Sequence, residues 1–328
     1  MCLKTNEWEF THDVSRSWEQ SDALSQVMTT TTKPTVRKIL VTGATGFTGR
    51  EVVPRLLQRY GEITCFVRAS SKRSQIDLPG VKFAEGDIDD CVSLEAAMQG
   101  KDTLVNVAFL VRHGEPEARR AKGIVRSCHA AGIRRAIFIS STSIFTTLKA
   151  ADKIAKLASE SAVVNSGLDY TILRPTMIYG TEGDRNIIRL VRFLRRYPVV
   201  FVPGDGTFRQ QPVHVEDLAQ AIVDCLDVKT TIGKAYNLSG AHSVTFNEVI
   251  DQTCQVLDVK RLKVHLPLGP ALWLARLSQH LQGKPLIKEE QLLRLNEDKS
   301  IDHCDARRDF GFSPRSFLEG IRQEVAQL

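Results

Sequence analysis

The sequence predicts an α/β protein with a doubly wound parallel sheet and a smaller, mostly helical lobe toward the C-terminus. Three observations predict this architecture. From residue 37 to residue 180, apolar runs of strand length alternate with amphipathic segments of helix length, which is typical of a parallel sheet covered by helices on both faces. The first apolar run leads directly into a glycine-rich turn. Beyond residue 180 the alternation becomes irregular and helical patterns predominate.

Six apolar runs are expected to form the strands of this sheet. Each run is short, rich in branched or aromatic residues, and bounded by turn residues or by a helical pattern. Because helical segments separate them, consecutive strands should run in the same direction. The runs are KILVTG (38–43), EITCFVR (62–68), VKFAEGD (81–87), DTLVNVAFL (102–110), RAIFISS (135–141) and YTILRPTMIYG (170–180).

The composition limits the kinds of function. The 328 residues are 42% hydrophobic and 25% charged, with a formal net charge of +6 at pH 7. That balance suits an anionic small ligand but lacks the clustered basic residues of a nucleic-acid-binding protein. No apolar run reaches the length of a transmembrane helix, so stable membrane insertion is not expected. The seven cysteines are scattered without metal-ligand spacing, which favours reduced thiols in the cytoplasm and no metal site.

A dinucleotide site is predicted by the stretch VTGATGFTGR, residues 41–50. Gly43 allows a tight turn, Gly46 lets the backbone approach a pyrophosphate, and Gly49 lets the following helix pack closely on the strand. The amino end of that helix offers free N–H groups and a positive dipole to phosphate. This strand, turn and helix therefore indicate a Rossmann-type nucleotide loop. Contacts with the cofactor are expected from Gly43, Thr45, Gly46, Phe47, Thr48 and Gly49.

The end of the second strand favours NADP(H) over NAD(H). An NAD site usually has an acidic residue there, which accepts a hydrogen bond from the ribose 2′-hydroxyl. Here the residue is Arg68, whose guanidinium suits a 2′-phosphate but can also stack on adenine. After the third strand, Asp87 and Ile88 are expected to hold the adenine through a carboxylate and an apolar contact, unless Asp87 is a plain loop residue.

These patterns divide the chain into three regions. Residues 1–36 are polar and without clear periodicity, so we expect a disordered tail, within which Met28 is a possible true start. Residues 37–180 are expected to form the NAD(P)-binding Rossmann domain. Residues 181–328 are expected to form a substrate-binding lobe, except that residues 210–240 return to the Rossmann sheet.

Several motifs together resemble the extended and atypical short-chain dehydrogenase/reductases, most closely the nucleoside-diphosphate-sugar epimerase/dehydratase branch. The resemblance runs from residue 38 to the C-terminus. In that family the dinucleotide lies across the strand ends, and the substrate binds under the C-terminal lobe. The motifs are TGATGFTG, GDIDD, FISSTS, SGLDYTILRPTMIYG, PVHVEDLAQAI and ARRDFGFSPRSFLEG.

The resemblance implies a catalytic centre, but two of its usual residues are missing. The family uses a serine or threonine after the fifth strand, here Thr142 or Ser143, and a tyrosine four residues before a lysine that holds the nicotinamide ribose. Lys156 matches that lysine, whereas Asp152 stands where the tyrosine belongs. A carboxylate is already ionised at neutral pH, so it is a poor proton donor. An asparagine of the preceding helix is also absent, and RRAKG occupies residues 119–123.

The resemblance extends the cofactor site to two further strand ends. In the family, backbone after an Arg-Pro pair positions the nicotinamide carboxamide, which here means Thr176, Met177 and Ile178. Ala108 and Pro175 are placed at the cofactor by the same resemblance. Together with the glycine loop, these positions predict a cofactor that crosses the sheet from its second strand to its sixth.

Two more lysines precede Lys156 on the same predicted helix. Lys149 and Lys153 share a face with Lys156, because the three fall at helical i, i+4, i+7 spacing. Only Lys156 coincides with a family position. We therefore expect Lys149 and Lys153 to lie on a solvated helix face and to carry no chemistry.

Three functions remain open for such a protein without the tyrosine. First, chemistry continues with another proton donor, for which Lys156, Thr142, Tyr179 or a chain of water molecules are candidates; Tyr179 either points into the cleft or simply ends a strand. Second, the domain binds NADP(H) without turnover, as the complex I accessory subunit of this fold is thought to do. Third, it reduces a more easily reduced substrate, as isoflavone-reductase-like relatives do without the tyrosine.

The first of these functions is the working hypothesis. It describes an NAD(P)-dependent oxidoreductase or epimerase of the sugar-nucleotide epimerase/dehydratase type, with hydride transfer at the nicotinamide and a proton donor other than tyrosine. The expected cofactor is NADP, with NAD as the alternative. The expected partner is a small molecule, for which a nucleotide sugar is one candidate, and a homodimer is a possible assembly.

Overall fold

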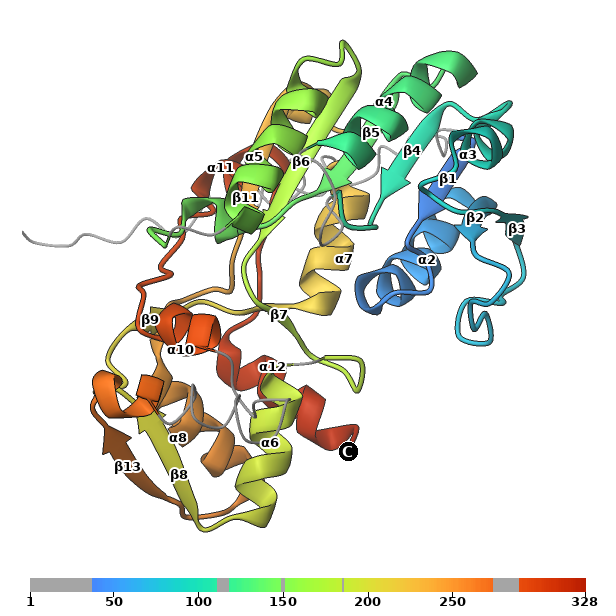
Figure 1. Ribbon diagram of the computed structural model, residues 1–328. Coiled ribbons are helices and arrows are strands. Elements are labelled where there is room, and N and C mark those ends of the chain that lie inside the picture. The colour runs from blue at the N-terminus through green and yellow to red at the C-terminus, as the bar shows by residue number, and fades with distance from the viewer. Residues whose placement is uncertain (1–36, 111–117, 149–150, 185, 274–288) are drawn as a thin grey trace, which may run out of the picture. The chain divides into compact units, whose positions relative to one another are not determined.

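Seven parallel strands form the central sheet (Figure 1). The computed structural model describes residues 37–110, 118–148, 151–184, 186–273 and 289–328. The spatial order of the strands is β11-β6-β5-β4-β1-β2-β3, and every neighbouring pair is parallel. The strands are β1 (Ile39–Thr42), β2 (Ile63–Val67), β3 (Val81–Glu85), β4 (Thr103–Asn106), β5 (Arg135–Ile139), β6 (Asp169–Pro175) and β11 (Lys234–Leu238).

Strand β1 lies at the point where the strand order reverses. Strands β2 and β3 extend the sheet on one side of β1, and β4, β5, β6 and β11 extend it on the other. Open α/β sheets bind their ligands at such a switch point, outside the carboxyl ends of the strands. The predicted doubly wound parallel sheet is confirmed. Strand β11 comes late in the chain and pairs with β6 at one edge.

Helices cover both faces of this sheet. On one face, α2 (Phe47–Tyr60) packs against α7 (Val215–Asp224), and their apolar residues share a buried cluster with β1 and β2. On the other face, α3 (Cys91–Met98), α4 (Arg119–Ala131) and α5 (Ala151–Val164) follow one another and contribute to a second buried cluster. The helices that follow the strands therefore begin near the carboxyl ends of the strands, where a ligand would bind.

The side chains of β1 explain why its sequence is apolar without alternation. Ile39 and Val41 point into the first cluster, and Leu40 points into the second. All three side chains are at most 1% exposed. Burial of each such side chain contributes about 1.5–3 kcal/mol relative to exposure, so both faces of this strand stabilise the fold.

The C-terminal lobe has small cores of its own. Helix α6 (Ile187–Arg196) packs on α8 (Phe246–Leu257), and α8 packs on α12 (Phe317–Ala326). Pairs of short strands complete the lobe, although the sequence analysis expected mainly helices there. They are β7 (Ile178–Tyr179) with β10 (Val213–His214), β9 (Arg209–Gln210) with β12 (Val244–Thr245), and β8 (Val199–Pro203) with β13 (Leu262–Leu266). The short helix α10 (Glu289–Leu295) follows, whereas α11 (Cys304–Phe310) packs against β11 of the central sheet.

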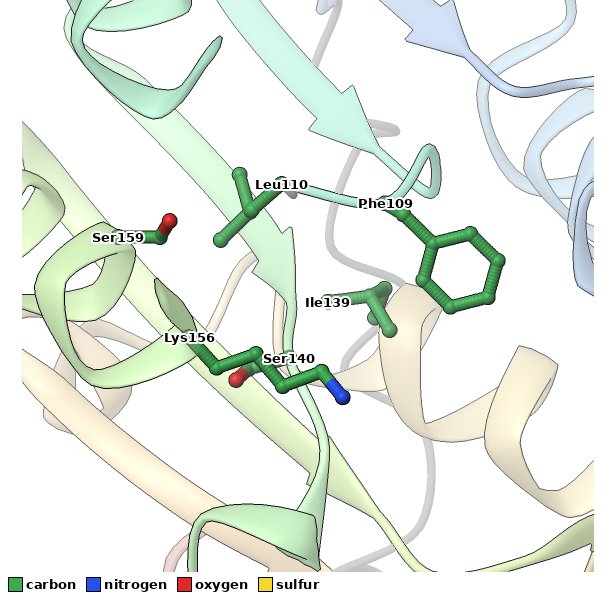
Figure 2. Close-up of a pocket in the computed structure, with 6 residues that line it drawn as sticks. All are labelled: Phe109, Leu110, Ile139, Ser140, Lys156 and Ser159. Carbon is green, nitrogen blue, oxygen red and sulfur yellow. The ribbon is translucent and has the colours of Figure 1, made fainter. Parts of the chain in front are cut away.

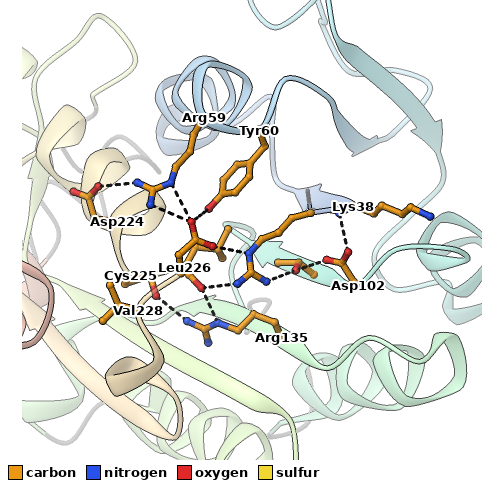
Figure 3. A network of polar contacts seen from close by, with 12 residues as sticks. Lys38, Arg59, Tyr60, Asp102, Arg135, Asp224, Cys225, Leu226 and Val228 are labelled. Atoms are coloured by element: carbon orange, nitrogen blue, oxygen red, sulfur yellow. Dashed lines mark hydrogen bonds and ion pairs between the residues drawn. The ribbon is translucent and has the colours of Figure 1, made fainter. Parts of the chain in front are cut away.

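A polar network ties the amino ends of the strands to α2 and α7 (Figure 3). Arg37 Nε donates to Asp227 Oδ1 at 2.7 Å. The other carboxylate oxygen of Asp227 accepts from the Tyr60 hydroxyl at 2.9 Å and from Arg59 Nε at 3.1 Å. Burial opposes ionisation of Asp227, but the hydrogen bonds from Arg37 and Tyr60 hold its pKa below the usual value. This network lies at the end of the sheet opposite the strand carboxyl ends.

Arg135 fastens the carboxyl end of α7 in the same network (Figure 3). Its guanidinium donates to the carbonyl oxygens of Cys225 at 2.9 Å, Leu226 at 3.2 Å and Asp169 at 2.8 Å. The residue is 6% exposed, and burial lowers its pKa. A cation at the carboxyl end of a helix is favoured by the helix dipole, so Arg135 joins β5 to α7.

Candidate functional site

The glycine loop leaves no room for side chains at two positions. Gly43 has φ of +73°, and a Cβ there would lie 2.6 Å from the Ala108 amide nitrogen. A Cβ at Gly49 would lie 2.2 Å from the Gly43 carbonyl oxygen. Helix α2 begins at Phe47, has no acidic residue in its first turn, and has no side-chain cap at Gly46. The free N–H groups of the first turn therefore remain available to a diphosphate, as the dinucleotide prediction requires.

Arg68 directly follows β2 at the same end of the sheet. It is exposed, and among the described residues its guanidinium has no ion-pair partner. The nearby Arg73 differs, because it pairs with Glu85 and lies over the Phe83 ring at 5.2 Å. A turn in which the Ser71 amide donates to the Arg68 carbonyl at 2.9 Å positions the backbone. Arg68 is therefore free to bind an anion, and its contact with a ribose 2′-phosphate stays a prediction.

The loop after β3 carries the predicted adenine contacts. The Asp87 carboxylate accepts from the Asp89 amide at 3.0 Å, and Asp90 caps α3 by accepting from the Val92 amide at 3.1 Å. Ile88 is half-buried against the apolar cluster of α3 and α4. These bonds give the loop a defined shape. Contact of Asp87 and Ile88 with adenine stays a prediction.

Ser143 and Lys156 meet at the carboxyl end of β5. Ser143 lies in a short 3₁₀ turn, Thr142–Phe145, and Lys156 lies on α5. Lys156 Nζ donates to Ser143 Oγ at 3.1 Å. The same nitrogen is 3.4 Å from Asp152 Oδ2, one helical turn away, and the Asp152 side chain is half exposed. The structure thus brings together two of the predicted catalytic residues, with Asp152 at their solvent side.

A small pocket lies beside this pair (Figure 2). Lys156 reaches it from α5, and Phe109 and Leu110 line it from the segment after β4. Phe109 is 75% exposed, so its ring is accessible from solvent. The complete lining is Phe109, Leu110, Ile139, Ser140, Lys156 and Ser159.

The other predicted hydroxyl, Thr142, has a different partner. Its Oγ1 donates to the Pro175 carbonyl oxygen at 3.3 Å, so Ser143 and not Thr142 contacts the lysine. Thr176 is also engaged, since its amide donates to Leu238 at 2.9 Å and its hydroxyl to Gln211 at 2.5 Å. Its own donors are therefore unavailable to a carboxamide. Cofactor contacts by the neighbouring Met177 and Ile178 stay predictions.

The expectation that Tyr179 is a candidate proton donor is wrong. Its side chain is fully buried in the core of the C-terminal lobe, and its hydroxyl donates to the Phe317 carbonyl oxygen at 3.4 Å. Its ring packs edge-on against His214 at 5.3 Å. Burial raises the pKa of Tyr179 far above its ordinary value. The alternative interpretation, in which Tyr179 ends a strand, matches β7.

The expectation that Lys153 lies on a solvated helix face also needs correction. Lys153 is half-buried, and its Nζ donates to the Thr146 carbonyl oxygen at 2.6 Å. It therefore supports the segment that follows the 3₁₀ turn. The sequence pattern did not reveal this contact, because helical spacing relates Lys153 only to residues on its own helix. Lys149 lies outside the described residues.

Sequence reasoning missed a carboxylate, Glu297, that binds the segment directly after the 3₁₀ turn of Ser143. Glu297 accepts from Thr146 Oγ1 at 2.7 Å, from the Thr147 amide at 2.5 Å and from Thr147 Oγ1 at 2.8 Å. Burial opposes ionisation of Glu297, but the hydrogen bonds from Thr146 and Thr147 lower its pKa. About 150 residues separate the partners, so no local pattern could have indicated this contact.

The described residues contain neither a metal-ligand group nor a membrane-spanning helix. No three histidine, cysteine, aspartate or glutamate side chains in the part of the chain that the structure describes come together as a metal-ligand group. Within the same residues, no helix has the length and apolar character needed to span a bilayer.

The fold and the glycine loop define a dinucleotide-binding protein, and comparison with known proteins identifies the family. The NAD(P)H-binding family matches residues 43–229, which is more than half of the chain. The chain belongs to this family. Its homologues and structural neighbours are extended short-chain dehydrogenase/reductases of the NAD-dependent epimerase/dehydratase type, so the predicted resemblance is confirmed.

Three similar proteins illustrate the range of the family. The UDP-glucose 4-epimerase of Vibrio cholerae is 24% identical over 88% of this chain and 94% of its own length. Subunit 9 of the NADH dehydrogenase [ubiquinone] 1 alpha subcomplex of Arabidopsis thaliana is 30% identical over 64% of this chain and 56% of its own length. The UDP-glucuronic acid 4-epimerase of Bacillus cereus, crystallised with NAD, has a TM-score of 0.69 at 19% identity, with 88% and 98% of the two chains covered.

Proposed function

We infer that this protein is an NADP(H)-preferring oxidoreductase or epimerase in which Ser143 and Lys156 handle the proton. The observation that carries this proposal is the 3.1 Å hydrogen bond between Lys156 Nζ and Ser143 Oγ at the carboxyl end of β5. A bound nicotinamide nucleotide would supply or accept a hydride at this edge of the sheet. The preference for NADP(H) is supported by Arg68, whose guanidinium is exposed after β2.

Each residue of the pair has a distinct role in this proposal. Ser143 Oγ accepts a hydrogen bond from the lysine, so its own hydrogen is free to donate to a substrate oxygen. Lys156 holds three protons, of which one faces Ser143 and another faces Asp152. A proton can therefore pass from the ammonium through the serine hydroxyl to an alkoxide that develops on the substrate. Water at the solvent side then returns a proton to the lysine, and the nearby Asp152 carboxylate stabilises the restored ammonium.

A nucleotide sugar is the first substrate to test. The proteins with similar folds include epimerases whose names specify UDP-glucose and UDP-glucuronic acid, and the basic net charge of +6 suits an anionic substrate. The apolar side chains of Phe109, Leu110 and Ile139 beside Lys156 favour a second candidate, the reductase of an apolar carbonyl compound.

A redox-silent NADP(H)-binding subunit is the rival from another class. It is favoured by the aspartate at position 152 and by similarity to a respiratory-complex subunit. The decisive experiment incubates the purified protein with NADPH, NADP⁺ and, in turn, nucleotide sugars, ketones and quinones. Absorbance at the reduced-nicotinamide band follows reduction, and NMR of the sugar products detects epimerisation without net redox change. Tight nucleotide binding with no product from any substrate would support the rival.

The assembly and location of the protein are part of the same proposal. We expect a cytoplasmic protein that acts on a small molecule and does not bind nucleic acid, and a homodimer is a possible assembly. Sedimentation velocity at several protein concentrations would distinguish a monomer from a dimer, and it needs no knowledge of the substrate.

A further inference from the structure

Helix α4 begins with an unfavourable arrangement of charge. Arg119, Arg120 and Lys122 occupy its first turn, which has no acidic residue. Cations are disfavoured there because the amino end of a helix carries a partial positive charge. The preceding Ala118 has φ of +61° and gives no side-chain cap. A cation at this helix end therefore needs a compensating partner.

Arg120 has such partners on two separate loops. Its Nε donates to Asp89 Oδ1 at 2.6 Å, and its Nη2 to Asp89 Oδ2 at 2.5 Å. Its Nη1 donates to the Phe109 carbonyl oxygen at 3.2 Å. The Arg120 side chain is only 10% exposed. One guanidinium thus joins the loop after β3 to the loop after β4.

Both loops adjoin the nucleotide site. The Asp89 amide donates to the Asp87 carboxylate at 3.0 Å. A contact that holds Asp89 in place therefore also holds the Asp87 carboxylate, which is the predicted contact with adenine. Phe109 follows Ala108, whose backbone lies so close to Gly43 that a Cβ there would be 2.6 Å away. Arg120 is therefore connected to the adenine loop through Asp89 and to the glycine loop through Phe109.

We propose that Arg120 is a positioning residue for the nicotinamide nucleotide. It holds the loop of Asp87 and Ile88 at a fixed spacing from Ala108 and the glycine loop, so the adenosine half meets a preformed slot. A preformed slot improves affinity because binding then orders fewer groups. Arg120 stands in the RRAKG segment, where the sequence lacks the family asparagine. The proposal rests on nucleotide binding by the glycine loop and is independent of any turnover.

The test is a double-mutant cycle read by calorimetry with NADPH. Arg120→Met and Asp89→Asn are each expected to weaken NADPH binding about tenfold, equivalent to about 1.4 kcal/mol. The double variant should bind no more weakly than Arg120→Met, because both changes break the same contact. Arg119→Met is the matched control: it removes one exposed cation from the same helix turn and should change the affinity less than twofold.

Two further measurements separate positioning from a general structural effect. Arg120→Met should weaken binding of 2′-phospho-ADP-ribose as much as binding of NADPH, but leave nicotinamide mononucleotide unaffected. Arg120→Lys keeps the positive charge but keeps only some of the hydrogen bonds to Asp89 and Phe109, so this variant should bind NADPH with intermediate affinity. If Arg120→Met does not fold, Arg120→Lys and Asp89→Asn give the answer. The proposal is overturned if these variants bind NADPH like Arg119→Met, or if the mononucleotide loses affinity equally.

Discussion

Lys156 Nζ lies 3.1 Å from Ser143 Oγ and 3.4 Å from Asp152 Oδ2. The lysine therefore stands between a hydroxyl on the sheet side and a carboxylate on the solvent side. The family residue expected at position 152 is a tyrosine, which would itself deliver the proton. With an aspartate in its place, the proposed proton route runs through the lysine and the serine.

Removal of the lysine should abolish turnover without unfolding the protein. Lys156→Met is expected to lower kcat at least 100-fold on any substrate found, because general acid catalysis typically contributes 10²–10⁴-fold. Ser143→Ala should lower kcat to a similar extent. Asp152→Asn should change it only a few-fold, since an exposed ion pair is worth about 0–1 kcal/mol. Steady-state kinetics with NADPH measures all three, and full activity of Lys156→Met would exclude the proposed proton route.

Arg68→Ala should change the cofactor preference. The variant is expected to weaken NADPH binding at least tenfold and NADH binding less than twofold, because only NADPH carries the 2′-phosphate that a guanidinium would pair with. Titration calorimetry with both nucleotides measures this difference. Arg126→Ala, at another exposed position, controls for the loss of one positive charge. Equal losses for both nucleotides would indicate stacking on adenine and not phosphate recognition.

Glu297→Ala should loosen the segment that follows Ser143. The carboxylate is the acceptor for the Thr147 amide and for two threonine hydroxyls, so amide exchange over residues 142–148 should become faster. Hydrogen-exchange mass spectrometry detects this change at the peptide level. Asp298→Asn is the control, because Asp298 accepts from the Arg209 amide and does not touch the segment. Unchanged exchange in Glu297→Ala would show that the contact does not order the segment.

The buried Glu324 should make stability depend on pH. Its carboxyl is fully buried, and neither oxygen has a hydrogen-bond partner among the residues that the structure describes. Burial, with a smaller effect of Asp184, raises its pKa from 4.5 to about 8. Between these values the folded state binds a proton that the unfolded state has lost, so the free energy of unfolding falls as pH rises from about 4.5 to about 8.

Glu324→Gln removes this titration. The variant should therefore be more stable than the parent protein at pH 8, and the difference should shrink toward pH 5. Urea unfolding at several pH values measures both curves. Parallel curves for Glu324→Gln and the parent would mean that the carboxyl ionises freely in the folded protein.

The parts of the fold that could be predicted are those with local signals. The apolar run before Gly43, the three glycines and the amphipathic helix lie within about 25 consecutive residues, so their geometry follows from sequence spacing. The register of Lys156 with the turn that holds Ser143 is similarly local, because only 13 positions separate them. Strands β8 and β13 were not predicted. Their parallel pairing joins Val199 to Leu262, and nothing near either residue indicates the partner.

The errors at the candidate site have the same origin. Tyr179 ends a strand, and the sequence does not say whether that end faces the cleft or the core of the second lobe; in the structure, Phe317 covers it. Glu297 binds Thr146, which lies 151 positions earlier in the chain. Arg120 binds the carbonyl oxygen of Phe109, which lies 11 positions earlier. One signal for Arg120 was present, because three basic residues at the start of a helix oppose its dipole.

The late position of α7 in the chain has a consequence for synthesis. This helix, at Val215–Asp224, covers the apolar residues of α2, and Asp227 binds Arg37 across 190 positions. While a ribosome is still making the first two hundred residues, α7 is not yet available to cover its side of α2. The nascent polypeptide therefore completes this face of its nucleotide-binding sheet only after residues 215–227 have been translated, and until then chaperones have an apolar surface to recognise.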